Sequence, residues 1–296
     1  MIKKAYLYIS LTLLLWSSTA AVAKLLLKSL NVFQLLLYVS LIASISLFVI
    51  IIFQNKIDVI RKYKFKDYCF FAFMGFIGIY LYHMFLFLGF ASASVQEIFI
   101  VNYTWPIWVV IFGILILKEK ISILTVLAIS ICFFGVYIVV SKGDLTSISF
   151  ENIQGDFFAL VGAISYGLFS VIGKKDQRDI VTSMMFYYFF SFIFAFITTL
   201  IFSTFPAITM DELIGLIWLG VFAMGIAFVF WFLALKHGNT AEMSNIIYLT
   251  PFISLIYIYF LIGEQILISS IFGLLLIIFG IYLYNNLKLL RKQIKK

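Results

Sequence analysis

The sequence NYTWP at positions 102–106 combines residue types that suit a ligand with a polar part and a planar apolar part. On a helix, Asn102 shares a face with Trp105, three residues on, and with Pro106, four residues on. This face offers an amide, an indole N–H and the Asn102 backbone carbonyl, which loses its donor to the proline. The alternative is a packed contact that satisfies its own polar groups. We favour binding because an asparagine within an apolar segment is costly without a partner.

A second candidate region precedes Pro251, where Tyr248 and Thr250 stand close to the proline. Asn245, Tyr248 and, roughly one turn on, Pro251 follow one stripe of a helix. Polar and aromatic side chains therefore meet a proline twice in this chain. In this second region, binding and packing roles are equally well supported.

Trp16 and His83 are candidates from earlier in the chain. Trp16 is followed by two serines and is expected to face the same site as Trp105. His83 has Tyr80 and Tyr82 nearby. An imidazole titrates near neutral pH, so His83 could carry a proton or contact a carboxylate, or it could be a neutral side chain that hydrogen-bonds a tyrosine. Proton coupling is therefore left open.

Two glutamates, Glu97 and Glu242, each follow a short break in the apolar pattern and fall in the first turn of a helix. A carboxylate is favourable at a helix N-terminus, with Ser94 or Thr240 available as the capping residue. A helix cap is therefore the first explanation for both glutamates. A contact that acts as a gate is the alternative.

No arrangement of residues points to catalysis or to metal binding. Ser/His/Asp groupings, metal-ligand spacings and Gly-rich phosphate loops are missing from the sequence. Cys69 and Cys132 both lie inside apolar runs, which disfavours a disulfide framework and a metal site. We predict a protein that is not an enzyme and uses neither a metal nor a cofactor.

The segment that carries NYTWP is repeated 145 residues later in the chain. The sequence holds three prolines and six glutamates, and two of the former and four of the latter pair at this single offset. Such agreement among rare residues indicates an internal duplication. The pairs are Glu97 with Glu242, Tyr103 with Tyr248, Pro106 with Pro251, Glu119 with Glu264, Gly75 with Gly220, and Gly135 with Gly280.

Each copy of this segment is long and apolar enough to cross a membrane. A helix rises about 33 Å between its two glutamates and about 14 Å from the first glutamate to the proline. A bilayer core is about 30 Å thick, so each proline bends its helix near mid-depth. The whole chain is 64% hydrophobic and 11% charged. It fits ten spans, at approximately 5–23, 32–53, 68–90, 95–117, 123–140, 156–173, 183–202, 213–235, 243–261 and 268–286.

The distribution of basic residues predicts the orientation. With the N-terminus in the cytoplasm, 18 of the 21 Lys and Arg residues fall on the cytoplasmic side. We therefore predict a multi-pass protein of the inner or plasma membrane, with both termini cytoplasmic, whose surroundings are the lipid bilayer and not nucleic acid. Lys24 and Lys174 end the first helix of each half, and we expect their side chains to extend to the membrane interface.

The duplication predicts two halves of opposite orientation. Each half has five spans, an odd number, so the second half enters the membrane in the opposite sense. The predicted fold is an all-α membrane protein with two inverted five-helix repeats, residues 1–145 and residues 146–296, around a central cavity. Freed backbone groups at the two prolines would be tolerated where they face such a cavity.

Ten spans in two inverted halves, with Trp16 and two serines in the first helix, resemble the EamA type of the drug/metabolite transporter superfamily. Glu119 and Glu264, which close the two proline-containing helices, extend the resemblance over nearly the whole chain. Within this superfamily, NYTWP preceded by Glu97 looks like the aromatic amino acid exporter subgroup. HGN at 237–239, followed by Met243 and by YLTP at 248–251, is similar to the same subgroup.

The resemblance implies a basket of helices around a central cavity, with the fifth and tenth helices as a scaffold. It also implies a protein that moves small metabolites, since members commonly export amino acids. His83 has no role that the resemblance transfers. Carried over position by position, the cavity residues would be Trp16, Asn102, Trp105, Pro106, Tyr248, Thr250 and Pro251.

We therefore expect a transporter that exports small metabolites, with amino acids and especially aromatic ones favoured, by alternating access. A multidrug carrier or another metabolite carrier of the same fold is the alternative, because a fold does not fix a substrate. A non-transporting membrane enzyme or sensor is disfavoured by the paired prolines in inverted repeats. A channel would need a continuous polar path, which the sequence does not show.

Overall fold

The computed structural model describes residues 2–92, 98, 101–144, 146, 152–263 and 267–294. Within these ranges the regular structure is helical and contains no strand. Two helices contain π-helical turns, η1 and η2, in which the backbone is wound more widely than in an α-helix. The helices are α1 (Ile2–Leu26), α2 (Val32–Phe53), α3 (Ile57–Arg61), α4 (Phe65–Gly75), η1 (Phe76–Leu81), α5 (Tyr82–Ser92), α7 (Trp105–Leu117), α8 (Ile123–Val140), α9 (Ile153–Lys175), α10 (Ile180–Phe202), α11 (Met210–Ile217), η2 (Trp218–Ile226), α12 (Ala227–His237), α13 (Thr240–Ile247), α14 (Thr250–Ile262) and α15 (Ile268–Ile294).

Among the described residues, eight helical stretches are long and apolar enough to cross a membrane, which confirms the prediction of a multi-pass helical membrane protein. Two further apolar helices are shorter, Trp105–Leu117 and Ile268–Tyr284, and they coincide with the fourth and tenth predicted spans. The membrane-length stretches are Lys3–Ala23, Val32–Phe53, Phe65–Leu86, Ile123–Val140, Ile153–Lys175, Ile180–Phe202, Met210–His237 and Thr240–Leu261.

Polar residues next to the apolar runs set where several helices begin. Asn31 accepts a hydrogen bond from the Gln34 backbone N–H at 3.1 Å, and the Gln34 side chain accepts one from the Asn31 backbone, so the two form a capping box at the start of α2. Asn239 caps α13 by accepting from the N–H groups of Ala241 and Glu242 at 3.0 and 3.3 Å. The cap of α13 is thus Asn239, one residue before the expected Thr240.

Both duplicated prolines start new helices rather than bending continuous ones. Pro106 is the second residue of α7, after a turn at positions 103–104, and Pro251 is the second residue of α14, after a turn at positions 248–249. Proline fits the first turn of a helix because no N–H is required there. The carbonyl of Ile247, four residues before Pro251, accepts a hydrogen bond from the Thr250 hydroxyl at 2.5 Å. Each proline therefore follows a short turn that interrupts the regular α-helix.

The π-helical turns also occur at corresponding places in the two copies. Moving η1 by 145 residues gives positions 221–226, which lie within η2. The similarity between the copies thus extends from the sequence to an unusual backbone conformation. Such turns are frequent at functional sites.

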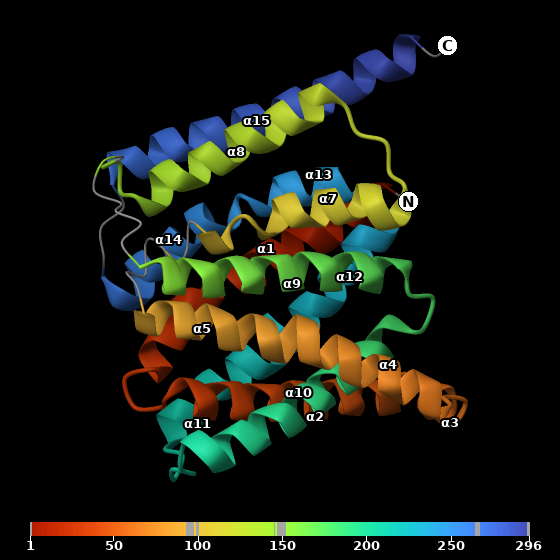
Figure 1. Cartoon of the computed structure of the whole chain (residues 1–296), viewed down its shortest axis with the longest axis vertical. Helices are drawn as coiled ribbons and strands as arrows, with labels where there is room; N and C mark the ends of the chain where they lie inside the picture. The colour runs from red at the N-terminus through yellow and green to blue at the C-terminus, as the bar shows by residue number, and fades with distance from the viewer. Residues whose placement is uncertain are drawn as a thin grey trace.

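Helices α8 and α15 lie side by side at one edge of the bundle (Figure 1). Glycines allow their close approach: a Cβ on Gly135 would lie 2.7 Å from the Gly273 carbonyl oxygen, and one on Gly280 would lie 2.8 Å from the Ala128 carbonyl oxygen. Gly135 and Gly280 are a pair at the 145-residue offset, so the two copies use the same position at this contact. The pairing agrees with the scaffold role that the resemblance implies for the fifth and tenth helices.

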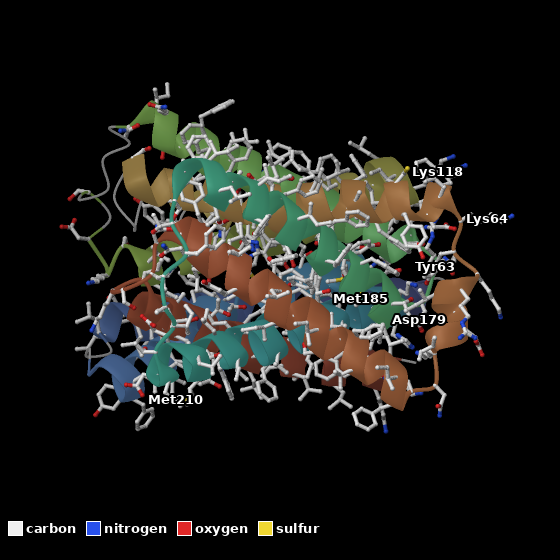
Figure 2. The ribbon with its side chains drawn as sticks, turned by 90° about the horizontal axis from the view of Figure 1, so that it is seen from below. Tyr63, Lys64, Lys118, Asp179, Met185 and Met210 are labelled. Atoms are coloured by element: carbon white, nitrogen blue, oxygen red, sulfur yellow. The ribbon has the colours of Figure 1, made fainter. Side chains whose placement is uncertain are left out.

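The remaining helices pack around a core that contains buried tryptophan and tyrosine side chains. Charged residues gather near the ends of the bundle: Figure 2 shows Lys64, Lys118 and Asp179 at one end and Met210 toward the other. Helix α1 begins and α15 ends on the same side of the molecule (Figure 1). This side is called the terminal end below.

Candidate functional site

Five aromatic side chains from four helices meet in the core, and they are called the aromatic cluster. The ring centroid of Trp105 on α7 lies 4.9 Å from Tyr166 on α9 and 5.4 Å from Trp231 on α12. Trp16 on α1 lies 5.0 Å from Phe228 on α12 and 6.2 Å from Trp105. Their edge-to-face and tilted arrangements are those that aromatic rings prefer. The structure therefore brings the predicted Trp16 and Trp105 together.

The polar atoms of the aromatic cluster are only partly satisfied. The Trp231 indole N–H donates to the Ser170 hydroxyl at 3.1 Å. The Trp16 indole nitrogen is buried and has no hydrogen-bond partner among the described residues. Leaving a buried donor without an acceptor costs about 1–3 kcal/mol, so the Trp16 N–H is an unsatisfied donor in the core.

Asn102 lies beside the aromatic cluster, just before the break that precedes α7. Its side chain is 5% exposed, and its Oδ1 atom finds no partner within the described part of the chain. Its amide nitrogen is 3.5 Å from the Tyr82 hydroxyl, which is at the limit of a hydrogen bond. The Tyr82 ring lies 4.7 Å from Tyr166, so it joins Asn102 to the cluster. Pro106 is buried next to Trp105.

His83 lies one ring away from the aromatic cluster. Its ring centroid is 4.8 Å from that of Tyr82, and its Nδ1 donates to the Ile79 carbonyl at 2.6 Å. The side chain is 5% exposed, and it follows the π-helical η1. The bond to Ile79 fixes the orientation of the imidazole, which favours the interpretation of His83 as a hydrogen-bonded core residue.

Tyr248, the candidate from the second copy, lies in a different part of the core. It is fully buried and belongs to a cluster with Cys132 of α8 and Ile277 of α15. Its hydroxyl and both polar atoms of Asn245 have no partner among the described residues. The structure thus places Tyr248 on the α8–α15 side of α13 and not with Trp16 and Trp105.

Thr250 approaches the aromatic cluster through its backbone. The Ser17 hydroxyl, next to Trp16, donates to the Thr250 carbonyl at 3.2 Å, which ties α1 to the start of α14. The Thr250 hydroxyl donates a hydrogen bond to the Ile247 carbonyl, and the neighbouring Pro251 is buried. Thr250 therefore borders the site by its main chain.

Glu97 and Glu242 are the two glutamates that were expected to cap helices. Glu97 lies outside the described residues. Glu242 is in the first turn of α13, is 3% exposed and accepts a short hydrogen bond from the Tyr6 hydroxyl of α1. Glu242 therefore joins two helices in addition to lying at a helix N-terminus.

A second polar group at the terminal end involves Lys174, whose side chain turns inward. Its Nζ lies 2.8 Å from Glu119 Oε1, 2.9 Å from the Thr240 hydroxyl and 3.2 Å from the Gly238 carbonyl oxygen. The side chains of Lys174 and Glu119 are 15% and 18% exposed. Lys174 thus pairs with a partly buried carboxylate, and its extension to the membrane interface stays a prediction. The Lys24 side chain lies outside the described residues.

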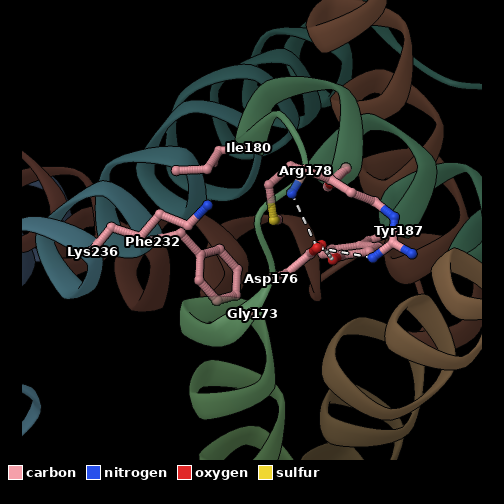
Figure 3. Close-up of a pocket in the computed structure, with 9 residues that line it drawn as sticks. Gly173, Asp176, Arg178, Ile180, Tyr187, Phe232 and Lys236 are labelled. Carbon is pink, nitrogen blue, oxygen red and sulfur yellow. Dashed lines mark hydrogen bonds and ion pairs between the residues drawn. The ribbon is translucent and has the colours of Figure 1, made fainter. Parts of the chain in front are cut away.

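The turn between α9 and α10 holds a separate ion-paired group (Figure 3). Asp176 accepts from the Arg178 guanidinium at 2.9 Å and from the Tyr187 hydroxyl at 3.3 Å, and Arg178 also pairs with Asp67 of α4 at 2.6 Å. Of two cavities that adjoin this ion pair, the one between Phe232 and the ion pair has a volume of about 10 Å³. That volume admits about one water molecule, so the cavity is too small for a metabolite.

Sequence comparisons give the protein its family. The EamA-like transporter family model matches residues 3–141 and again residues 153–286. The chain belongs to the EamA-like transporter family. This confirms the resemblance at the level of the family and makes the protein a membrane transporter, a class that is generally not enzymatic.

Relatives of this EamA-like transporter carry no assigned substrate. An uncharacterized transporter of Archaeoglobus fulgidus is 23% identical over 95% of this chain and 96% of its own. The uncharacterized transporter YoaV of Bacillus subtilis is 27% identical over 86% of each chain. A solved crystal structure matches with a TM-score of 0.84 over 96% of this chain and 98% of that one, at 18% identity, which supports the fold alone. The aromatic exporter subgroup stays a prediction.

Several residues of the transporter's core were not among the predicted site residues. Tyr166 had a sequence signal, because it stands eight residues before Lys174, as Trp16 stands eight before Lys24. Phe228 and Tyr82 had none, since phenylalanine and tyrosine are frequent throughout the chain. Among the described residues, no group of His, Cys, Asp and Glu could hold a metal ion.

Proposed function

We propose that this EamA-like transporter exports small amphipathic metabolites, amino acids above all and aromatic ones in particular. The aromatic cluster carries the proposal: it combines ring faces and edges with two buried polar atoms, Trp16 Nε1 and Asn102 Oδ1, that no described residue satisfies. One is a donor and the other an acceptor. An amino acid offers a carboxylate to the donor, an ammonium group to the acceptor and a side chain to the rings.

The proposed transport cycle is alternating access in a ten-span inverted repeat, formed by residues 1–145 and residues 146–296. The two proline breaks support it, because interrupted helices at mid-depth are the usual place of substrate sites in such repeats. The cluster draws on α1 and α7 from the first half and on α9 and α12 from the second half. A site between halves is the place where rocking of one half against the other would expose a substrate to each side in turn.

The proposed location is the inner or plasma membrane, with both termini in the cytoplasm. Lys64 and Lys118 lie at one end of the bundle (Figure 2), and basic residues favour the cytoplasmic side. The terminal end is then cytoplasmic. The basic residues that the sequence assigns to this side include Lys56, Lys174 and Arg178.

The test is counterflow of labelled amino acids in proteoliposomes that contain the purified protein, with and without a proton gradient. We expect saturable counterflow of tryptophan and phenylalanine, and at least a tenfold loss, about 1.4 kcal/mol, in Trp105→Ala. Phe279→Ala on α15, which removes a ring that is 51% exposed on the outside of the bundle, is the matched control and should transport normally.

Two outcomes would contradict this proposal. If Trp105→Ala leaves the transport of every amino acid unchanged, the aromatic cluster is not the substrate site. Movement of a cationic drug without any amino acid would favour a multidrug carrier, since aromatic faces also attract cations. Dependence of the rate on the proton gradient would distinguish proton-coupled from facilitated transport.

A further inference from the structure

Polar side chains connect the two halves of the chain at the terminal end, away from the aromatic cluster. Lys174 of α9 holds Glu119, which follows α7, and Thr240, which starts α13. The Thr240 hydroxyl also donates to Glu119, so the three side chains form a closed ring of contacts. Two residues further on, Glu242 accepts from Tyr6 of α1. Four helices are thus joined in one layer.

We infer that Glu119, Lys174 and Thr240, with the bond between Tyr6 and Glu242, form the gate that closes the terminal end of the transport path. The inference rests on the proposed function, because a gate presupposes a path. It assigns the gate to these residues and gives Lys174 the central place in it.

The location of these contacts at helix ends supports a gate over a fixed structural tie. Helix α7 stops at Lys118, whose left-handed backbone (φ 56°) turns the chain so that Glu119 lies back over the helix. Lys174 is the penultimate residue of α9, and Thr240 is the first residue of α13. A helix that tilts moves most at its ends, so contacts placed there break first and re-form last.

The layer also joins the parts that alternating access must separate. Tyr6 and Glu119 lie within the first region that matches the family model, and Lys174, Thr240 and Glu242 lie within the second. Any rocking of one half against the other at this end breaks both connections. The partial exposure of Lys174 and Glu119 lets water solvate the two charges when they part, which keeps the cost of opening moderate.

The gate lies at a consistent distance from the proposed substrate site. Tyr6 precedes Trp16 by ten residues on α1, about 15 Å along the helix, and Lys174 follows Tyr166 by eight residues on α9, about 12 Å. Two helices therefore place the layer at about the same depth below the aromatic cluster. A substrate that leaves the cluster toward the terminal end has to pass this layer.

The test measures access to Thr12, which is fully buried on α1 one helical turn before Trp16. Thr12→Cys is made in a background of Cys69→Ser and Cys132→Ala, and a membrane-impermeant maleimide is added on the cytoplasmic side of inside-out vesicles. We expect slow labelling in this background and labelling at least about fivefold faster with Lys174→Gln or Thr240→Val. The matched control is Lys175→Gln, an exposed neighbour without an ion pair to a described residue, which should leave the rate unchanged.

The double variant Glu119→Lys with Lys174→Glu exchanges the two charges and should return the labelling rate toward that of the background. If single substitutions sped labelling only by loosening the fold, the double variant would not slow it again. Labelling that Lys174→Gln and Thr240→Val leave unchanged would overturn the gate, and so would a charge exchange that labels as fast as Lys174→Gln alone. Counterflow in the same vesicles separates the two proposals. If amino acid counterflow is normal but the gate substitutions do not change the labelling rate, the gate is wrong and the proposed substrate stands. If the gate substitutions raise the labelling rate but no amino acid moves, the proposed substrate is wrong and the gate is supported.

Discussion

The two proline breaks share a backbone design but differ in chemistry. In both copies a helix stops, a short turn follows and a new helix starts with proline in its first turn. Before Pro106, Asn102 and Trp105 face the aromatic cluster. Before Pro251, Tyr248 faces α8 and α15. The duplication thus preserved the break in the helix while the polar and aromatic side chains around it diverged.

The divergence has a functional consequence. If substrate binds at the aromatic cluster, the break before Pro106 supplies side chains to it and the break before Pro251 supplies main chain, through the Thr250 carbonyl that accepts from Ser17. Side chains select a substrate, whereas an interrupted backbone gives a helix the freedom to move. We therefore expect substitutions before Pro106 to change substrate recognition and those before Pro251 to change stability.

The largest expected difference is between Trp105→Ala and Tyr248→Ala. Both remove a buried ring, and each should lower the free energy of unfolding by about 3–5 kcal/mol. Trp105→Ala should also raise the half-saturating concentration for aromatic counterflow at least about tenfold, because its ring borders the substrate. Tyr248→Ala should leave that concentration unchanged in the protein that remains folded.

Thermal unfolding in detergent and counterflow on the same preparations separate the two effects. The less disruptive Tyr248→Phe, which keeps the ring and removes the hydroxyl that no described residue satisfies, is the control for misfolding. An increase of the half-saturating concentration in both alanine variants would show that the two copies contribute equally, and the comparison would fail.

The pair Asn102→Leu and Asn245→Leu should give smaller effects of opposite kinds. In the proposed site the unpartnered Oδ1 atom of Asn102 binds substrate, so its loss should weaken counterflow about fivefold, about 1 kcal/mol. Asn245 is 1% exposed, and neither of its polar atoms has a partner among the described residues. Its replacement by leucine should raise the unfolding temperature and leave transport unchanged. Reduced transport by Asn245→Leu would indicate that Asn245 also binds substrate or moves in the cycle.

The presence of several membrane-length helices could be predicted from the sequence, because the length of each apolar run sets the length of a span. The rotation of each helix about its axis could not. In a soluble helix an apolar stripe marks the buried face, but all eight residues of α13 are buried, polar and apolar alike, so no stripe shows which way Tyr248, directly after this helix, points. Trp16 and Trp105 were predicted from their local motifs, since Trp16 precedes two serines and Trp105 lies within NYTWP.

The inward turn of Lys174 illustrates a second limit. A lysine at a helix end can extend to water or pair with a carboxylate, and the choice depends on where Glu119, 55 residues earlier, is placed in space. Spacing along a single helix carries no such information. The glutamate was recognised as the end of a repeated segment, but its partner became visible only when α7, α9 and α13 were assembled.

The smallest expected effect concerns how the second helix of each copy begins. Helix α2 is capped by the neutral Asn31, and α10 is capped by Asp179, which accepts from the Thr182 backbone N–H at 3.0 Å and pairs with Lys56 at 2.7 Å. Burial by itself would raise the pKa of the Asp179 carboxyl. The hydrogen bonds from Lys56 and Thr182 outweigh burial, so this pKa lies below its ordinary value.

A folded-state pKa that is lowered stabilises the fold above the ordinary pKa of aspartate, and this stability is lost as the pH falls through the lower value. Wild-type protein should therefore lose about 1 kcal/mol more stability than Asp179→Asn between about pH 5 and pH 3, since asparagine keeps the cap but not the charge. Asn31→Asp, which adds a carboxylate to the other copy, is the reciprocal variant. Unfolding temperatures measured across this pH range should converge for wild type and Asp179→Asn at the acid end. Parallel curves would mean that the charge of Asp179 adds nothing to its cap, and the two helix starts would then be equivalent.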